Sequence, residues 1–61
     1  MYTLSVDGSQ KSCSGSILEE IQAMGKNPDS YLYLIGGMPV PMDSVPDDGR
    51  TVECIRVASG G

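Results

Sequence analysis

The last eleven residues of the chain read TVECIRVASGG, residues 51–61, and this stretch decides the fold. Its first seven residues are rich in β-branched side chains, which predicts a strand. Val52 and Cys54 lie two residues apart and are expected to face the core, whereas Ile55 is one residue out of phase and should face outwards. The last four residues carry no large apolar side chain. We therefore expect a strand that leads out of a domain, residues 1–57, into a flexible tail.

The segment before this strand contains a second strand, an edge piece and a turn. Residues 31–35 read YLYLI, and an apolar run of β-forming residues predicts a central strand. Two glycines then break the run. Pro39 and Pro41 confine residues 38–42 to a sheet edge, because proline cannot donate to a ladder of hydrogen bonds. Residues 47–49, Asp-Asp-Gly, predict a turn before the last strand.

The first thirteen residues predict a hairpin. Residues 2–6 alternate large apolar with small polar side chains, which is the pattern of a half-buried strand. Asp7 and Gly8 follow, and both tolerate the positive φ angles of a type I′ turn. Residues 9–13 are expected to form the returning strand.

A short helix is expected after the hairpin. Ser16 and Glu19 have the spacing of a capping box, in which each side chain satisfies a free backbone N–H of the first turn. Gly25 suits the left-handed position that ends a helix, and Pro28 lies just beyond it. The predicted apolar stripe consists of Ile17, Leu18, Ile21 and Met24.

The order of these elements predicts an α+β fold with a mixed sheet of four to five strands and one helix packed on one face. The whole chain has 61 residues, which allows one domain. A domain of this size has little volume for an enclosed substrate pocket. We therefore expect a protein that is not an enzyme by itself and that binds no cofactor.

The composition excludes several classes of partner. Four Lys and Arg residues stand against eight Asp and Glu residues, and the net charge of −4 argues against nucleic acid and suits a basic surface on a partner protein. The sequence shows neither a signal peptide nor an apolar run of membrane-spanning length, so a cytoplasmic monomer is expected. Cys13 and Cys54 should then be free thiols, and two cysteines without histidine fall short of a zinc site.

Two segments resemble the β-grasp, ubiquitin-like sulfur carriers and modifiers, a family that includes ThiS, MoaD, the ubiquitin-related modifiers and the small archaeal modifier proteins. Residues 34–41, LIGGMPVP, resemble the strand-turn segment V-x-G-x-x-V-P of that family. Residues 48–61 resemble its closing turn, strand and diglycine tail. The chain lacks the phenylalanines usual in the last strand of MoaD and has Gly36 where many ThiS-like chains carry asparagine. Its compact length and Pro-Val-Pro piece are most similar to the archaeal modifier branch.

The resemblance implies that Gly61 is the reactive residue and that Gly60 gives it access to a narrow channel. In this family an E1-like activating enzyme uses ATP to adenylate the C-terminal carboxylate. A sulfur donor protein then yields a thiocarboxylate, or a lysine of a target protein takes the acyl group as an isopeptide. Residues 58–61, fully extended, span about 13 Å, enough to reach a neighbouring active site. Lys11 and Lys26 are possible acceptors for conjugation.

The docking surface is expected on the sheet face away from the helix, with Ile55 at its centre. The pattern of residues 31–35 is ambiguous, and outward tyrosines with inward leucines would suit the phenol groups. The resemblance favours the opposite register, with Leu32 and Leu34 outwards. The other residues expected to contact a partner are Val57, Ala58 and Ser59.

Three functions remain open at this point. The leading one is a sulfur carrier that also modifies proteins. Within the same family, the chain is instead a MoaD-like small subunit that inserts its tail into a synthase large subunit, or a ThiS-like thiamine carrier. Outside that group, it is a protein-interaction module with an inert tail.

Overall fold

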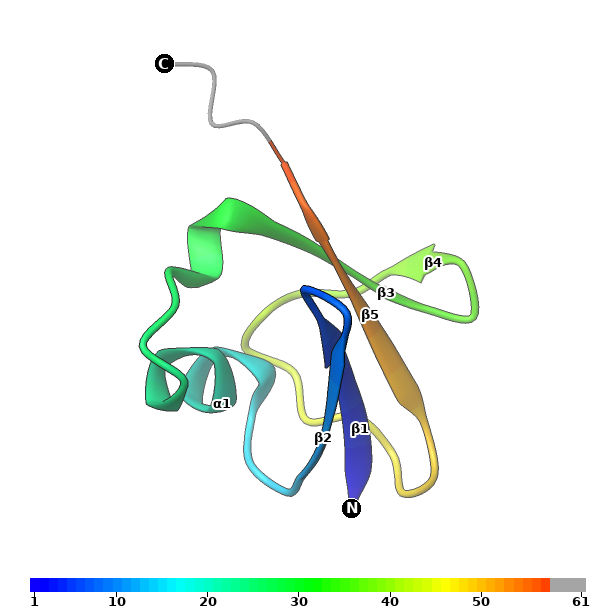
Figure 1. The fold of residues 1–61 in the computed structure, drawn as a ribbon. Helices are drawn as coiled ribbons and strands as arrows, with labels where there is room; N and C mark the ends of the chain where they lie inside the picture. The colour runs from blue at the N-terminus through cyan, green and yellow to red at the C-terminus, as the bar shows by residue number, and fades with distance from the viewer. Residues whose placement is uncertain (58–61) are drawn as a thin grey trace.

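The computed structural model describes residues 1–57, so the predicted tail, residues 58–61, lies outside the described part of the chain. The described residues form one helix, a short 3-10 turn and a five-stranded mixed sheet (Figure 1). The predicted α+β class is therefore confirmed. The elements in chain order are β1 (Tyr2–Val6), β2 (Ser9–Cys13), α1 (Ile17–Ala23), η1 (Pro28–Ser30), β3 (Tyr31–Ile35), β4 (Met38–Pro39) and β5 (Thr51–Arg56).

The sheet has the strand order β2-β1-β5-β3-β4, with β5 in the middle (Figure 1). β1 and β5 are parallel, and the other neighbouring pairs are antiparallel. The predicted central strand, residues 31–35, is β3, which pairs with β5 on one side and with the two-residue edge strand β4 on the other. The edge assignment of Pro39 is confirmed. Pro41 and Met42 follow β4 without belonging to a strand.

Local chemistry accounts for the hairpin and for both ends of the helix. Asp7 and Gly8 have φ angles of 50° and 80°, as a type I′ turn requires. Ser16 and Glu19 form the predicted capping box at the start of α1. Gly25, with a φ of 75°, takes the left-handed position just after the last turn.

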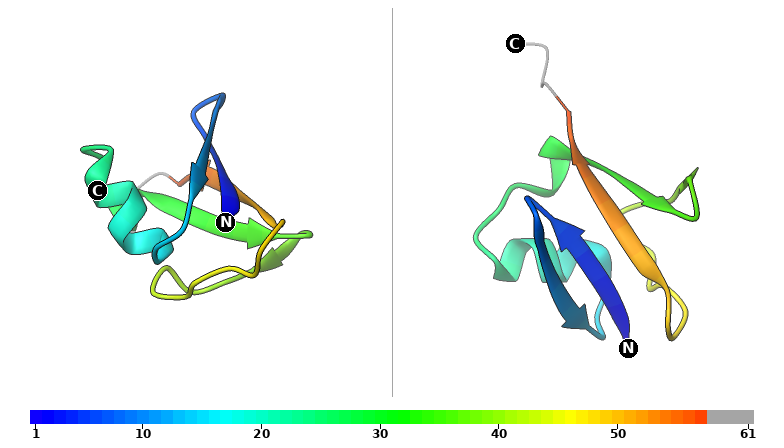
Figure 2. Two further views of the ribbon diagram at one scale, coloured as in Figure 1. Left: turned by 90° about the horizontal axis from the view of Figure 1, so that it is seen from below. Right: turned by 45° about the vertical axis from the view of Figure 1, so that its right-hand side comes forward.

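The core lies between α1 and one face of the sheet (Figure 2). Ile17 and Ile21 of the helix are fully buried, together with Leu4 of β1 and Val52 of β5. Met24 packs against this cluster as predicted. Leu18 is only half-buried and lies outside the core cluster, because it is one position off the stripe that faces the sheet.

The loop between β4 and β5 is tied to the start of α1. The backbone N–H of Ile17 donates to the carbonyl of Ser44 at 3.2 Å, and the N–H of Leu18 donates to the carbonyl of Met42 at 2.7 Å. Free N–H groups of a first helical turn need such acceptors. The loop therefore has a fixed position against the helix although it contains no regular structure.

Candidate docking face and the end of strand β5

The register of β3 places its tyrosines on the core side. Tyr31 and Tyr33 are buried, whereas Leu32 is 43% exposed and Leu34 is half-buried. The register with outward tyrosines is therefore wrong, and the one derived from the resemblance is confirmed. The rings pack inside because their hydroxyls still reach acceptors: the Tyr31 hydroxyl donates to Asp7 Oδ2 at 2.9 Å, and the Tyr33 hydroxyl donates to the Pro28 carbonyl at 2.7 Å.

Four apolar side chains lie together on the opposite side of β3 and at the end of β5. Leu32 pairs directly with Ile55 in the antiparallel register, so their side chains share one face. Ile55 is 44% exposed and Val57 is 38% exposed. We call Leu32, Leu34, Ile55 and Val57 the outer patch. The predicted outward direction of Ile55 and inward direction of Val52 are both confirmed.

The rest of this face differs in character from the outer patch. Thr3 and Ser5 of β1 lie on the same side of the sheet, and Glu53 pairs with Leu34. Small polar side chains thus cover the β1 half, and apolar ones cover the β3 half. A contiguous apolar area bordered by polar residues is typical of an interaction site. Ala58 and Ser59, also predicted to contact a partner, lie outside the described residues, as do Gly60 and Gly61.

A polar cluster that the sequence did not reveal surrounds the end of β5. The Asp7 carboxylate accepts a hydrogen bond from Lys26 Nζ at 2.9 Å as well as the one from the Tyr31 hydroxyl. Arg56 lies 3.6 Å from the same carboxylate oxygen and donates to the Tyr31 hydroxyl at 3.5 Å. We call these four residues the Asp7 cluster. Its members come from distant parts of the chain, so no local motif could have indicated it.

The two candidate acceptor lysines differ in their surroundings, because only Lys26 belongs to the Asp7 cluster. The hydrogen bond to Asp7 raises the pKa of Lys26, and its ammonium is engaged in an ion pair with that carboxylate. Lys11 lies on the edge strand β2 and is exposed. Lys11 is therefore the better-placed acceptor of the two.

Both thiols are free and neither is activated. Burial raises the pKa of Cys54 to about 11, and burial with the nearby Glu20 carboxylate raises the pKa of Cys13. A thiol is nucleophilic only as the thiolate, so both are inert at neutral pH. The prediction that they do not form a disulfide is confirmed. They lie on β2 and β5, which flank opposite edges of β1.

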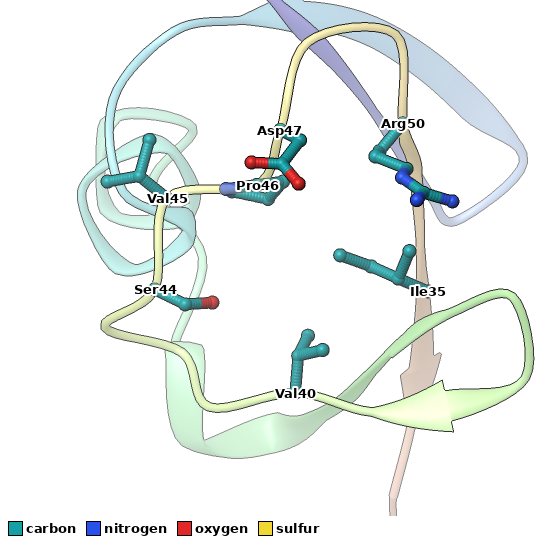
Figure 3. A pocket seen from close by; sticks show the side chains of 7 residues that line it. All are labelled: Ile35, Val40, Ser44, Val45, Pro46, Asp47 and Arg50. Carbon is teal, nitrogen blue, oxygen red and sulfur yellow. The ribbon is translucent and has the colours of Figure 1, made fainter.

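A shallow depression of about 390 Å³ lies beside the loop between β4 and β5 (Figure 3). Ile35 and Val40 point into it from the sheet side, and Asp47 and Arg50 face it from the loop. It is open to solvent and contains no paired acid and base or activated nucleophile. Within residues 1–57, no group of three or more His, Cys, Asp or Glu side chains is arranged to hold a metal ion.

No protein-family model and no curated protein matches this sequence. Among the described residues, no helix is long and apolar enough to cross a membrane. The function must therefore be inferred from the fold, the outer patch and the residues around the end of β5.

Proposed function

We propose that this chain is a β-grasp, ubiquitin-like sulfur carrier and protein modifier, closest to the small archaeal modifiers. Its Gly61 carboxylate is activated by an E1-like partner enzyme. The observation that carries the proposal is the course of β5. This strand, Thr51–Arg56, carries Val52 on its core side and Ile55 in the outer patch, and in the sequence only Val57 separates it from Ala-Ser-Gly-Gly.

The sheet topology supports the β-grasp assignment. The first and last strands, β1 and β5, are parallel neighbours, and β5 lies between the β1–β2 hairpin and the β3–β4 hairpin. One helix covers one face, and the other face carries the outer patch. This arrangement is compatible with the fold that the resemblance implies, and it leaves an apolar surface available beside the strand that precedes the diglycine.

The chemistry divides between the chain and its partner. A carboxylate is a poor acyl donor, so the Gly61 carboxylate attacks the α-phosphorus of ATP on the partner enzyme, giving an acyl adenylate and pyrophosphate. A sulfur donor then displaces AMP on the way to a thiocarboxylate, or a lysine amine displaces AMP and forms an isopeptide. Residues with a Cβ would obstruct a narrow channel, which is why glycine suits positions 60 and 61.

The outer patch supplies the affinity for the activating enzyme in this proposal. Ile55 lies only two residues before Val57, the last described residue. A contact between Ile55 and the partner would therefore also fix where the following residues enter the partner. Desolvation raises the pKa of both thiols, which supports a reaction at the carboxyl terminus instead. ATP is the partner's substrate, and the chain itself contributes no cofactor site to the reaction.

The test is an intact-mass measurement. The mass of the protein from its source is read first, because the proposal requires a chain that ends at Gly61. The protein is then incubated with ATP and the activating enzyme of the same organism, shown to be active on another carrier. An AMP adduct, or a sulfur-for-oxygen exchange after a sulfur donor is added, is the expected result. Peptide mapping of any conjugates should find Lys11 modified in preference to Lys26.

A truncated chain provides the control. Deletion of Gly60 and Gly61 should abolish the adduct while changing the free energy of unfolding by less than about 0.5 kcal/mol, as for surface changes. An unchanged mass for the full chain with a demonstrably active enzyme overturns the carrier function. It would leave the interaction module, whose tail is inert. Transfer of sulfur only in the presence of a synthase large subunit would instead identify the MoaD-like alternative.

A further inference from the structure

The last residues of β5 have a strand on one side only. β1 pairs with β5 from Thr51 to Cys54, and the parallel ladder ends there, at the pair of Val6 with Cys54. β3 continues the pairing to Ile55 and Arg56. Beyond Cys54 the strand therefore loses its neighbour on the β1 side, at the point where the chain leaves the sheet.

Asp7 occupies the place that the missing neighbour leaves. It follows Val6 directly, and its carboxylate reaches across to Arg56 of β5. The same carboxylate binds the Tyr31 hydroxyl of β3 and the Lys26 ammonium beyond α1. One side chain thus connects the hairpin turn, the segment after the helix, β3 and β5.

The contacts on the other side complete the attachment. The backbone N–H of Val57 donates to the Ser30 carbonyl at 2.9 Å, which ties the end of β5 to η1. The Arg56 guanidinium also lies 5.9 Å from the centre of the Tyr31 ring, within the range of a cation–π contact. The exit of the strand is therefore held from two directions, by Ser30 on one side and by Asp7 on the other.

The turn itself does not require a carboxylate at this position. Within residues 1–57, Asp7 is the one residue other than glycine with a positive φ, and asparagine adopts that conformation at least as readily. Lys26 and the Tyr31 hydroxyl also lower the pKa of the Asp7 carboxyl, so it is charged at neutral pH. The charge serves the contacts with Lys26 and Arg56.

We propose that Asp7 is a positioning residue, which fixes the direction of the end of β5 at Arg56 and Val57, the point from which the chain continues to residues 58–61. The consequence for catalysis rests on the proposed function, since a misdirected tail places the Gly61 carboxylate away from ATP. The structural part of the proposal does not depend on any activity.

The experiment compares Asp7→Asn with Asp29→Asn. Asp7→Asn keeps the turn and a side-chain oxygen for Tyr31 but removes the charge. Asp29 lies in the exposed η1 at the same end of the molecule and takes part in no ion pair among residues 1–57, so its variant is a matched control. Residual dipolar couplings of the amides of Ile55, Arg56 and Val57 report the strand's direction without any enzyme. These couplings should change in Asp7→Asn and stay unchanged in Asp29→Asn.

Adenylation kinetics provide the second readout. With the outer patch intact, Asp7→Asn should leave KM within about twofold and lower kcat by tenfold or more, since a small misplacement of a reacting group is costly. Arg56→Gln should lower kcat similarly, and the double variant should be no worse than either single one, because both remove the same contact.

The outcomes separate this inference from the proposed function. Unchanged couplings in Asp7→Asn overturn the positioning role. Changed couplings with an unchanged kcat overturn its consequence for catalysis. If the wild-type chain is never adenylated, the carrier function fails, while the couplings still decide whether Asp7 fixes the end of the strand.

Discussion

At the residue scale, the two cysteines show how burial decides chemistry. Cys13 is buried at the end of β2, and Cys54 packs against the core from β5. Both have pKa values above the ordinary thiol range because burial disfavours the thiolate. In a protein proposed to carry sulfur, these two sulfur atoms are structural, and the transferred sulfur is attached elsewhere.

We expect both thiols to react slowly in the folded protein. The labelling is carried out at pH 7.5, roughly one unit below the pKa of an ordinary thiol. Ellman's reagent should then react with the cysteine of an unstructured reference peptide at least about tenfold faster than with Cys13 or Cys54. Denaturant should expose two reactive thiols per chain. Only one or no thiol after denaturation, without prior oxidation, would contradict the unpaired state of Cys13 and Cys54.

At the element scale, the sequence predicts best those features that depend on residues close together in the chain. The turn at Asp7, the capping box at Ser16 and the helix end at Gly25 depend on residues at most a few positions away, and the sequence predicts all three correctly. The apolar run of residues 31–35 predicts a strand inside the sheet, and β3 has a neighbour on each side. One side of β3 faces the core and the other belongs to the outer patch, so a fully apolar strand did not require two buried faces.

The same distinction between local and tertiary interactions applies to the residues of the candidate site. Ile55 could be placed outwards from its phase relative to Val52, because alternation is a property of a single strand. The direction of Tyr31 and Tyr33 could not, since their hydroxyl acceptors at Asp7 and Pro28 come from other elements. Sequence reasoning likewise read Asp7 only as a turn residue, because Lys26 and Arg56 approach it through the tertiary fold.

The two faces of β5 should respond differently to substitution. Ile55→Thr keeps a β-branched strand former and removes apolar contact area, so stability should change by less than about 0.5 kcal/mol. Loss of about 1–2 kcal/mol of apolar burial in the complex should raise the KM for adenylation by roughly five- to thirtyfold. The measurements are activation kinetics and a thermal melt on the same preparation.

Val52→Ala is the matched change on the other face of the strand. Val52 is fully buried, so its truncation should lower the free energy of unfolding by about 1–3 kcal/mol while leaving KM nearly unchanged below the melting temperature. A stable Val52→Ala protein together with a normal KM for Ile55→Thr would show that the docking face lies elsewhere.

At the scale of the whole molecule, the tyrosines link folding to alkaline pH. Burial raises the pKa of Tyr2 and of Tyr33 to about 12, from an ordinary value of 10. A group whose pKa is raised by folding stabilises the folded state fully below its unfolded pKa and loses that contribution as pH rises through the folded value. The window of alkaline unfolding should therefore lie between about pH 10 and 12.

This window can be measured by phenolate absorbance and circular dichroism on one sample. Tyr2 and Tyr33 should ionise only near pH 12 in the native protein, together with the loss of secondary structure. In denaturant all three tyrosines should ionise near the ordinary value of 10. Substitution of either residue by phenylalanine should remove one late-titrating phenol. Ionisation of Tyr2 and Tyr33 near pH 10 in the native protein, with the fold retained, would contradict the effect of their burial.

The position of β5 in the sheet also determines at what point during synthesis the domain can complete its fold. β5 is the last strand within residues 1–57, yet it separates the β1–β2 hairpin from the β3–β4 hairpin, which have no ladder between them. A nascent chain therefore gains no complete sheet until Arg56 has left the ribosome, and the closure that pairs Thr3 with Thr51 spans most of the domain. The outer patch therefore lies beside the end of β5 only after the whole sheet has formed.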